Sequence, residues 1–393
     1  MAQRRLSEVA KKVGVSEATV SRVLNGKPGV SEATRQAVLT ALDVLGYERP
    51  TQLRGERARL VGLVLPELQN PIFPALADVV GSGLAQQGFT PVLCTCTGGV
   101  SEPDYVELLL AQQVSGVVFA GGSHAEDDAN HEHHYQLARR KLPVVLVNAA
   151  IDLDYPVVSC DDAVAVEQAF GHLVALGHQR IGMVLGPRDH IPSRRKLVAF
   201  KQCARRIGLT VDEHTIGHTM FSVEGGQAVG TRLVQNGITG LICASDPLAL
   251  GVIRAVRRLG LNTPDDISVI GYDDSALMTC TDPPLTTVRQ PIEAMGRAAV
   301  ELLANQIAGI EVSMEELLFE PELVVRASAA PANDRLRKGR AGRRHRLRLR
   351  LQGTGEHGPE PPRPDRVPAP LLGKTPPRHE AHPGADGEGA DCP

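Results

Sequence analysis

From residue 60 onward, the chain alternates between short, continuously apolar runs and segments with helical periodicity. Seven runs have the length of β-strands: residues 60–65, 91–94, 116–119, 143–147, 181–185, 241–243 and 267–270. Between most of them lie helical patterns such as residues 105–113, 164–176, 197–207, 226–234 and 248–259. Continuous apolar strands separated by helices predict parallel sheets covered on both faces. Such units over roughly 270 residues fit two doubly wound lobes better than one.

The same pattern favours a binding protein over an enzyme. Ligands of doubly wound sheets bind at the carboxyl ends of the strands, so two facing lobes predict a shared cleft. No G-x-G-x-x-G or Walker motif follows a strand, and no G-x-S-x-G motif is present, so we expect no nucleotide, no cofactor and no catalysis. Residues 124–135 hold His131, His133 and His134, which could bind a divalent ion, but their polar surroundings favour a solvated surface loop.

The first 48 residues contain three short helical patterns, none of which is expected to fold alone. One face of the first pattern is apolar, with Leu6, Val9, Ala10 and Val13. Gly14 ends this pattern, and Ser16 and Ser31 are placed to cap a second and a third helix. The tight turn at Gly14 predicts a helix-turn-helix arrangement.

The second helix would present small, hydroxyl and charged side chains to solvent. Such side chains suit contact with DNA, and an arginine such as Arg22 can hold guanine with two hydrogen bonds. An ordinary three-helix module with a solvated face is the alternative that periodicity leaves open.

Charge is distributed unevenly along the chain. The net charge is only −3, but residues 1–59 carry 11 basic and 6 acidic side chains, and residues 335–350 carry 9 basic and none acidic. The rest of the chain therefore has a net charge of −17. An acidic body with a basic end fits a protein that touches DNA through that end alone.

Several ordered motifs resemble one family over about residues 5–330. The stretch L-S-E-V-A-K-K-V-G-V-S-E-A-T-V-S-R-V-L-N-G resembles the DNA-binding headpiece of the LacI (lactose repressor) family. Later motifs agree with it: L-V-G-L-V-L-P-E-L-Q-N-P-I-F, H-L-V-A-L-G-H-Q-R-I-G, L-I-C-A-S-D-P-L-A-L-G, V-I-G-Y-D-D and P-P-L-T-T-V-R-Q-P-I-E-A-M-G.

The resemblance implies an all-α helix-turn-helix headpiece (residues 1–48), a hinge linker (49–59) and a two-lobed α/β core (60–330) like a periplasmic sugar-binding protein. It further implies a homodimer on double-stranded DNA with a pseudo-palindromic operator, and a small sugar-like effector between the lobes. We therefore expect a transcriptional regulator, most simply a repressor of carbohydrate-related genes. The alternatives are a regulator without effector control, a ligand sensor that acts through protein partners and, for the core alone, a free periplasmic binding protein.

The family's functional positions fall on particular residues here. The DNA-contacting positions are Ser16, Glu17, Ala18, Thr19, Ser21, Arg22, Asn25 and Leu53. The effector-contacting positions are Phe73, Lys196, Phe221, Asp246, Asp273 and Gln290, with Arg194 and Asp161 as weaker candidates. Carboxylates, amides and an aromatic ring suit a polyol.

Each effector position also has a structural interpretation. Phe73 could belong to the core, and Asp246, Asp273 and Gln290 could cap helices. Lys196 replaces an arginine that is frequent in the family, so the compact charge of an ammonium group stands in place of a planar guanidinium that can donate two parallel hydrogen bonds. Asn148 and Ala149 stand where an Asp-Arg pair is frequent, which weakens any naming of the sugar.

Two segments depart from the family pattern. The hinge is about one helical turn short, although Leu53 occupies the place of the leucine that wedges into the minor groove. Residues 331–393 are basic and then rich in proline and glycine, and we expect them to be disordered. They would be a phosphate-binding arm, a solvated appendage or a frameshift extension.

The expected compartment is the bacterial cytoplasm, at the nucleoid. No apolar run follows M-A-Q-R-R, and no stretch approaches the roughly 20 apolar residues of a membrane span. The seven scattered cysteines fit reduced thiols.

Overall fold

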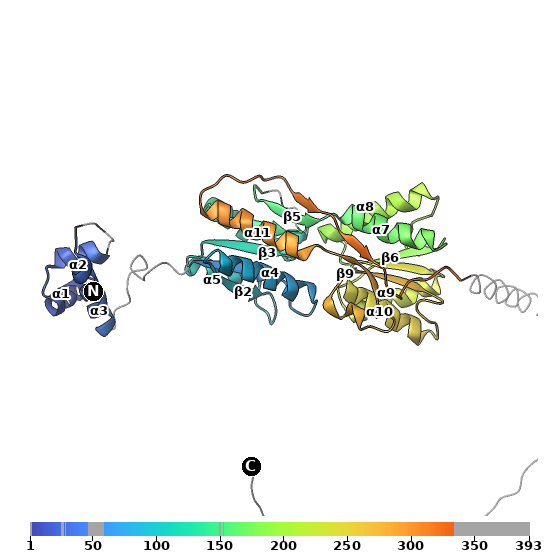
Figure 1. The fold of residues 1–393 in the computed structure, drawn as a ribbon, viewed down its shortest axis with the longest axis horizontal. Helices are drawn as coiled ribbons and strands as arrows, with labels where there is room; N and C mark the ends of the chain where they lie inside the picture. The colour runs from blue at the N-terminus through green and yellow to red at the C-terminus, as the bar shows by residue number, and fades with distance from the viewer. Residues whose placement is uncertain are drawn as a thin grey trace, which may run out of the picture. The chain divides into compact units, whose positions relative to one another are not determined.

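The computed structural model describes residues 2–24, 27, 29–45, 59–148, 151 and 153–333 (Figure 1). Its N-terminal part contains α1 (Ala2–Val13), α2 (Glu17–Leu24) and α3 (Glu32–Val44). Gly14, with φ of +73°, turns the chain from α1 into α2. As predicted, Ser16 and Ser31 cap the next helices: their side-chain oxygens accept the amides of Thr19 at 3.1 Å and Thr34 at 3.2 Å. The helices share a small core of Val9, Ala10, Val20, Val23, Val38, Leu39 and Ala41.

The first lobe is a six-stranded parallel sheet in the order β11-β5-β4-β3-β1-β2. Its strands are β1 (Leu60–Leu65), β2 (Thr90–Thr95), β3 (Gly116–Ala120), β4 (Val144–Val147), β5 (Val157–Cys160) and β11 (Leu317–Phe319). α4 (Ile72–Gln86) and α11 (Ile292–Ile307) pack together on one face of this sheet (Figure 1). α5 (Glu102–Ala111) and α6 (Glu132–Arg139) cover the other face through Val106, Leu109 and Leu137.

The second lobe repeats this plan in the order β12-β10-β9-β8-β6-β7. Its strands are β6 (Ile181–Leu185), β7 (Ile216–His218), β8 (Gly240–Cys243), β9 (Ser268–Asp273), β10 (Thr286–Arg289) and β12 (Glu322–Val324). Only β12 runs antiparallel to its neighbour. The helices of this lobe are α7 (Asp162–Ala175), α8 (Ile191–Arg206), α9 (Val223–Gln235) and α10 (Asp246–Arg258). Each lobe also contains a short 3₁₀ turn: η1 (Ser123–Ala125) in the first lobe and η2 (Ala276–Thr279) in the second.

The chain passes between the lobes after β5, after β10 and after β11. In each sheet, the strands at these crossings lie at one edge: β5 pairs with β11, and β10 pairs with β12. Two doubly wound lobes joined in this way confirm the predicted fold class. Each of the seven apolar runs lies in a strand to within one residue, and the structure adds β5, β7, β10, β11 and β12, which are only three or four residues long.

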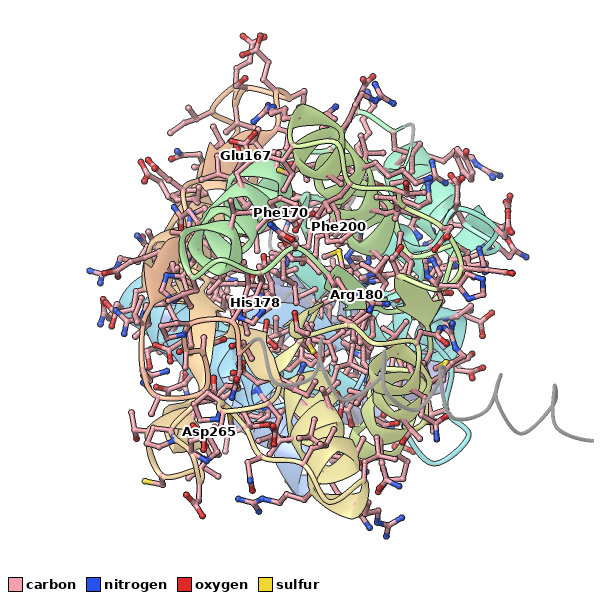
Figure 2. The ribbon with its side chains drawn as sticks, turned by 90° about the vertical axis from the view of Figure 1, so that its right-hand side faces the viewer. Glu167, Phe170, His178, Arg180, Phe200 and Asp265 are labelled. Atoms are coloured by element: carbon pink, nitrogen blue, oxygen red, sulfur yellow. The ribbon has the colours of Figure 1, made fainter. Side chains whose placement is uncertain are left out.

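Two contacts in the second lobe show how its outer end is held (Figure 2). Phe170 of α7 and Phe200 of α8 meet edge to face, with ring centroids 5.5 Å apart. His178, in the loop before β6, bonds Thr239 and Ser268 at 3.0 Å and the carbonyl of Ala330 at 3.1 Å. The end of the described chain is therefore tied to this sheet.

The prediction that residues 124–135 form a solvated surface loop is wrong for His124, His133 and His134. His124 lies in η1 and His133 and His134 in α6, and all three are buried. α6 turns these two histidines inward beside Leu137, so the polar composition of the segment concealed an inward face.

No helix in the described part of the chain combines the length and the apolar content that a membrane span requires.

Candidate DNA-binding face and ligand pocket

The exposed face of α2 carries the predicted DNA contacts that the structure describes. Glu17, Ala18 and Arg22 are exposed, while Thr19 and Ser21 are half-buried. Val20 and Val23 point into the core of the three helices and so fix which face of α2 remains outside. The Ser16 hydroxyl is 2.9 Å from that of Thr19, so these two hydroxyls already take part in the cap. Asn25 and Leu53 lie outside the described residues, as do residues 49–58 of the hinge and most of the tail.

A cavity of about 930 Å³ lies between the two lobes of the core. All six residues predicted to contact the effector line it: Phe73, Lys196, Phe221, Asp246, Asp273 and Gln290. Asp273 ends β9, Gln290 follows β10, and Phe73 and Asp246 lie in the first turns of α4 and α10, at the carboxyl ends of strands where doubly wound sheets bind ligands. This volume is within the range of small-molecule sites.

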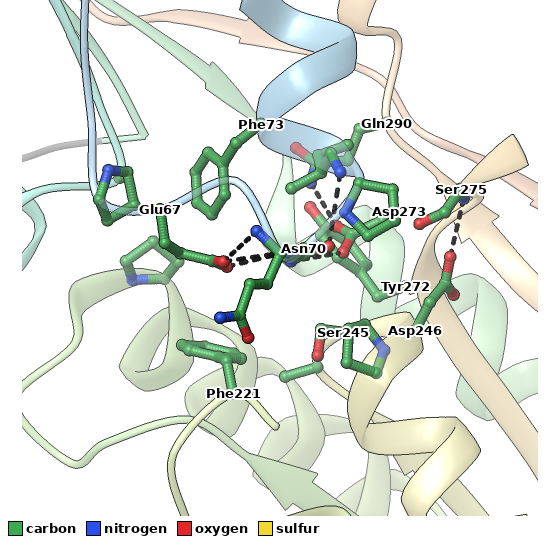
Figure 3. A pocket seen from close by; sticks show the side chains of 18 of the residues that line it. Glu67, Asn70, Phe73, Phe221, Ser245, Asp246, Tyr272, Asp273, Ser275 and Gln290 are labelled. Carbon is green, nitrogen blue, oxygen red and sulfur yellow. Dashed lines mark hydrogen bonds between the residues drawn. The ribbon is translucent and has the colours of Figure 1, made fainter. Parts of the chain in front are cut away.

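Asp273 is the centre of a polar network that joins the lobes (Figure 3). Its carboxylate accepts the Gln290 side-chain amide at 2.7 Å and the Asn70 side-chain amide, from the first lobe, at 3.4 Å. The Glu67 carboxylate accepts the backbone amide of Asn70 at 3.0 Å and so holds the turn before α4. Asp273 has φ of +118°, an unusual conformation for a residue with a side chain, as is often found at functional sites.

Asp246 forms a second buried centre and does not cap α10. Its carboxylate accepts the amide of Ser275 at 2.8 Å and the hydroxyl of Thr287 at 2.6 Å. The cap of α10 is Ser245, and the residue before α11 is Pro291, so neither Asp246 nor Gln290 has the capping role that was the alternative.

Burial perturbs both carboxyl groups. It raises the pKa of Asp246 to about 6, against the hydrogen bonds from Thr287 and Ser275 that favour the charged form. Burial, with the charge of Asp246 nearby, raises the pKa of Asp273 well above its usual range. Both effects favour the protonated form of Asp273, which can donate a hydrogen bond to a ligand as well as accept one.

Lys196 is not an unpaired cation. Its ammonium forms a buried ion pair with Asp162, at the start of α7, and lies 4.0 Å from the centroid of the Tyr272 ring. Burial raises the pKa of Asp162, and the charge of Lys196 acts against that rise. Because its partner is fixed, Lys196 offers an anionic ligand group little uncompensated charge.

Phe73 and Phe221 supply the apolar walls of the pocket (Figure 3). Both are half-buried, so Phe73 packs against the core and also faces the cavity. A Cβ atom on Gly121 would lie 2.6 Å from the Phe73 ring, and one on Gly186 would lie 2.1 Å from the Phe221 ring. The two glycines therefore give the rings their places.

Sequence reasoning missed several lining residues. Asn70 and Tyr272 stand inside the quoted motifs N-P-I-F and G-Y-D-D, so proximity in the chain could have found them. Asp162 gave no such signal. The weaker candidates act elsewhere: Asp161 caps α7 by accepting the amides of Ala163 and Val164, and Arg194 pairs with Asp127 at the surface.

Two family models match the chain. Residues 5–50 match bacterial regulatory proteins of the lacI family, and residues 170–329 match a periplasmic binding protein-like domain. Among curated relatives, the HTH-type transcriptional regulator MalR of Streptomyces coelicolor is 50% identical over 334 residues, which are 84% of this chain and 97% of that protein. The HTH-type transcriptional repressor CytR of Escherichia coli is 32% identical over 330 residues, which are 82% of this chain and 95% of that protein.

Solved structures give the same picture. The transcriptional regulator CelR in complex with cellobiose matches with a TM-score of 0.64 and 30% identity, covering 82% of this chain and 99% of that one. The lac repressor dimer bound to operator and the anti-inducer ONPF matches with a TM-score of 0.63 and 27% identity, covering 82% and 98%.

Proposed function

Because this chain belongs to the lacI family of bacterial DNA-binding regulators, we propose that it represses carbohydrate-related genes under the control of a sugar-like effector bound between its lobes. The observation that carries the proposal is the pocket, which amide and carboxyl groups line together with two phenyl rings. Rings cover the apolar face of a sugar, and the polar groups pair with its hydroxyls. The cellobiose complex of CelR supports a ligand of this class.

We assign DNA reading to the exposed face of α2. Contacts to phosphates would position the headpiece, and Glu17, Ala18 and Arg22 would select bases in the major groove. A homodimer would present two such helices, which requires a pseudo-palindromic operator. The proposed place of work is the cytoplasm, at the nucleoid.

The effector would act by linking the lobes. Asn70 belongs to the first lobe and Asp273 to the second, and their hydrogen bond already crosses the pocket. A ligand whose hydroxyls bond to both residues would favour one arrangement of the lobes. A coupling of about 1–3 kcal/mol would change operator affinity roughly 5- to 150-fold.

The first test is the selection of genomic fragments by the full-length protein at moderate salt, followed by sequencing. A shared palindrome near carbohydrate genes is expected. Arg22→Ala should weaken binding to it about 10- to 100-fold, while Lys201→Ala, a matched change at an exposed position of the core, should leave binding unchanged. Binding without any shared motif would overturn the proposal. Regulation that persists in Arg22→Ala would instead indicate a sensor acting through proteins.

The second test measures operator affinity with added sugars, using ribose and cellobiose to bracket ligand size. At least one sugar class is expected to change the affinity, and Asn70→Ala should weaken that response more than Asn236→Ala, at the half-buried C-terminal end of α9 and outside the pocket lining. If no sugar acts, the protein is a regulator without effector control.

A further inference from the structure

A second set of buried polar side chains lies in the first lobe, on the helix that precedes β3 and on the turn and helix that follow it. Glu102 begins α5, His124 lies in η1, and His134 lies in the first turn of α6. Glu102 is 5% exposed, and both histidines are fully buried. One ligand atom from each of the three residues lies within 4.8 Å of the others.

The hydrogen bond of His124 fixes its tautomer. Its Nε2 lies 3.2 Å from the carbonyl oxygen of Val147, which can only accept, so Nε2 carries the proton. The lone pair is therefore on Nδ1, which has no hydrogen-bond partner among the described residues. A Cβ atom on Gly122 would lie 3.4 Å from this Nδ1 and 2.1 Å from Glu102 Oε2. The absent side chain of Gly122 thus leaves room where the two donor atoms converge.

His134 is the least satisfied member of the cluster. Neither of its ring nitrogens has a hydrogen-bond partner within the described chain, although Nε2 lies 3.2 Å from Glu102 Oε1. The Phe119 ring, with its centroid 4.9 Å from that of His134, makes this an apolar place for a polar ring. Leaving buried polar atoms unpaired costs about 1–3 kcal/mol each.

Glu102 is held in place by groups that would form the second shell of a metal site. Its Oε1 accepts the Nε2 proton of His133 and the Ser123 hydroxyl, both at 2.7 Å, and its Oε2 accepts the amide of Ser123 at 3.1 Å. Hydrogen bonds to a metal ligand from neighbouring side chains orient the ligand and tune its affinity for the metal.

From this geometry we propose that Glu102, His124 and His134 bind one divalent transition-metal ion of the Zn²⁺ class. Two imidazoles and one carboxylate suit Zn²⁺, whereas Mg²⁺ and Ca²⁺ prefer oxygen ligands alone. Donor atoms about 3.3 Å apart are required for tetrahedral Zn²⁺, and the separation of His134 Nε2 from Glu102 Oε1 already meets this. His131, whose buried Nδ1 also lacks a described partner, is a candidate for the fourth ligand.

The bound ion would order a loop of the first lobe that contacts the second lobe. This bridging loop, residues 121–127, lines the pocket through Gly121 and Glu126. Glu126 forms a β-bridge with His190 of the second lobe, and the Asp127 amide donates to the carbonyl of Asp189 at 3.0 Å. Fixing His124 would therefore order a contact between the lobes. The link to effector affinity rests on the proposed function, whereas binding of the ion does not.

The test is titration of the chelator-treated, full-length protein with Co²⁺ and then Zn²⁺. One equivalent of Co²⁺ should bind with a visible spectrum typical of low coordination number, and Zn²⁺ should displace it. His134→Gln and His124→Gln should lose that spectrum, and His133→Gln, which keeps the three ligands, should bind about 10- to 100-fold more weakly.

The matched control is His214→Gln, at an exposed position of the second lobe, which should bind as the unmodified protein does. Equal binding by His134→Gln would assign the ion to other histidines and overturn the proposal, as would the absence of stoichiometric binding. Thermal unfolding of each variant separates loss of the site from loss of the fold.

Amide hydrogen exchange provides a readout that needs no effector. Zn²⁺ should slow exchange in residues 121–127 of the unmodified protein and not of His134→Gln. Unchanged exchange in a Zn²⁺-loaded protein would remove the link to the bridging loop. A metal-loaded protein that no sugar affects would contradict the proposed function and leave the site standing.

Discussion

The two lobes share one plan of six strands, but they treat their buried polar groups differently. In the second lobe, the carboxylates of Asp246 and Asp273 are paired with described donors, and Lys196 is paired with Asp162. In the first lobe, ring nitrogens of His124 and His134 have no described partner. The partners of Asp246, Asp273 and Lys196 hold these pocket side chains in place without a ligand. Because unpaired buried polar atoms are costly, the ring nitrogens of His124 and His134 indicate a site that a further group completes. Four substitutions test this difference.

The largest effect is expected from Lys196→Met. It removes the cation from a buried ion pair and leaves the Asp162 carboxylate without its partner. A loss of about 3–5 kcal/mol in the free energy of unfolding is expected, measured by urea denaturation. The double variant Lys196→Met/Asp162→Leu should recover most of this loss. If Lys196→Met were as stable as the unmodified protein, Asp162 would not depend on Lys196 as its ion-pair partner.

Asp246→Asn should change how stability depends on pH. The pKa of Asp246 in the folded protein, about 6, lies above the usual 3.8, so the folded state binds more protons between these values and loses stability as pH rises through them. The substitution should abolish a decline of about 3 kcal/mol between pH 4 and pH 7. Parallel pH profiles of the two proteins would contradict the raised pKa.

His134→Leu should increase the free energy of unfolding, whereas Lys196→Met should decrease it. In metal-free protein, an apolar side chain of similar volume removes two unpaired ring nitrogens from an apolar place. An increase of about 1 kcal/mol in stability is expected, since replacing unpaired polar groups with apolar ones is often favourable. With Zn²⁺ present the order should reverse, because only the unmodified protein gains from binding. A loss without metal would mean that the nitrogens are satisfied.

The smallest effect is expected from Asp273→Asn. Burial raises the pKa of Asp273 and so favours its protonated form, which is close in shape and charge to an amide, and the bond from Gln290 can remain. The change in stability at pH 7 should be less than about 1 kcal/mol. A markedly larger loss would indicate an ionised Asp273.

Structural features that depend on neighbouring residues in the chain were predicted better than features that depend on long-range contacts. Strand-length apolar runs and serine caps depend on neighbours in the chain, and both agree with the structure. The six pocket residues were identified from motifs, and they meet because parallel strands end at a shared edge. Glu102 and His124 come together only because α5 packs beside the end of β3, a contact that no local spacing predicts. The loop expected at residues 124–135 was wrong for the same reason.

The three crossings between the lobes have a mechanical consequence. They leave from one edge of each sheet, where β5 pairs with β11 and β10 pairs with β12. Parallel struts along a single edge resist stretching and sliding but let two bodies swing like the covers of a book. The opposite edges, β2 and β7, then travel farthest for a given swing. A small ligand bound near the crossings would therefore cause a larger displacement at the opposite edges of the two sheets.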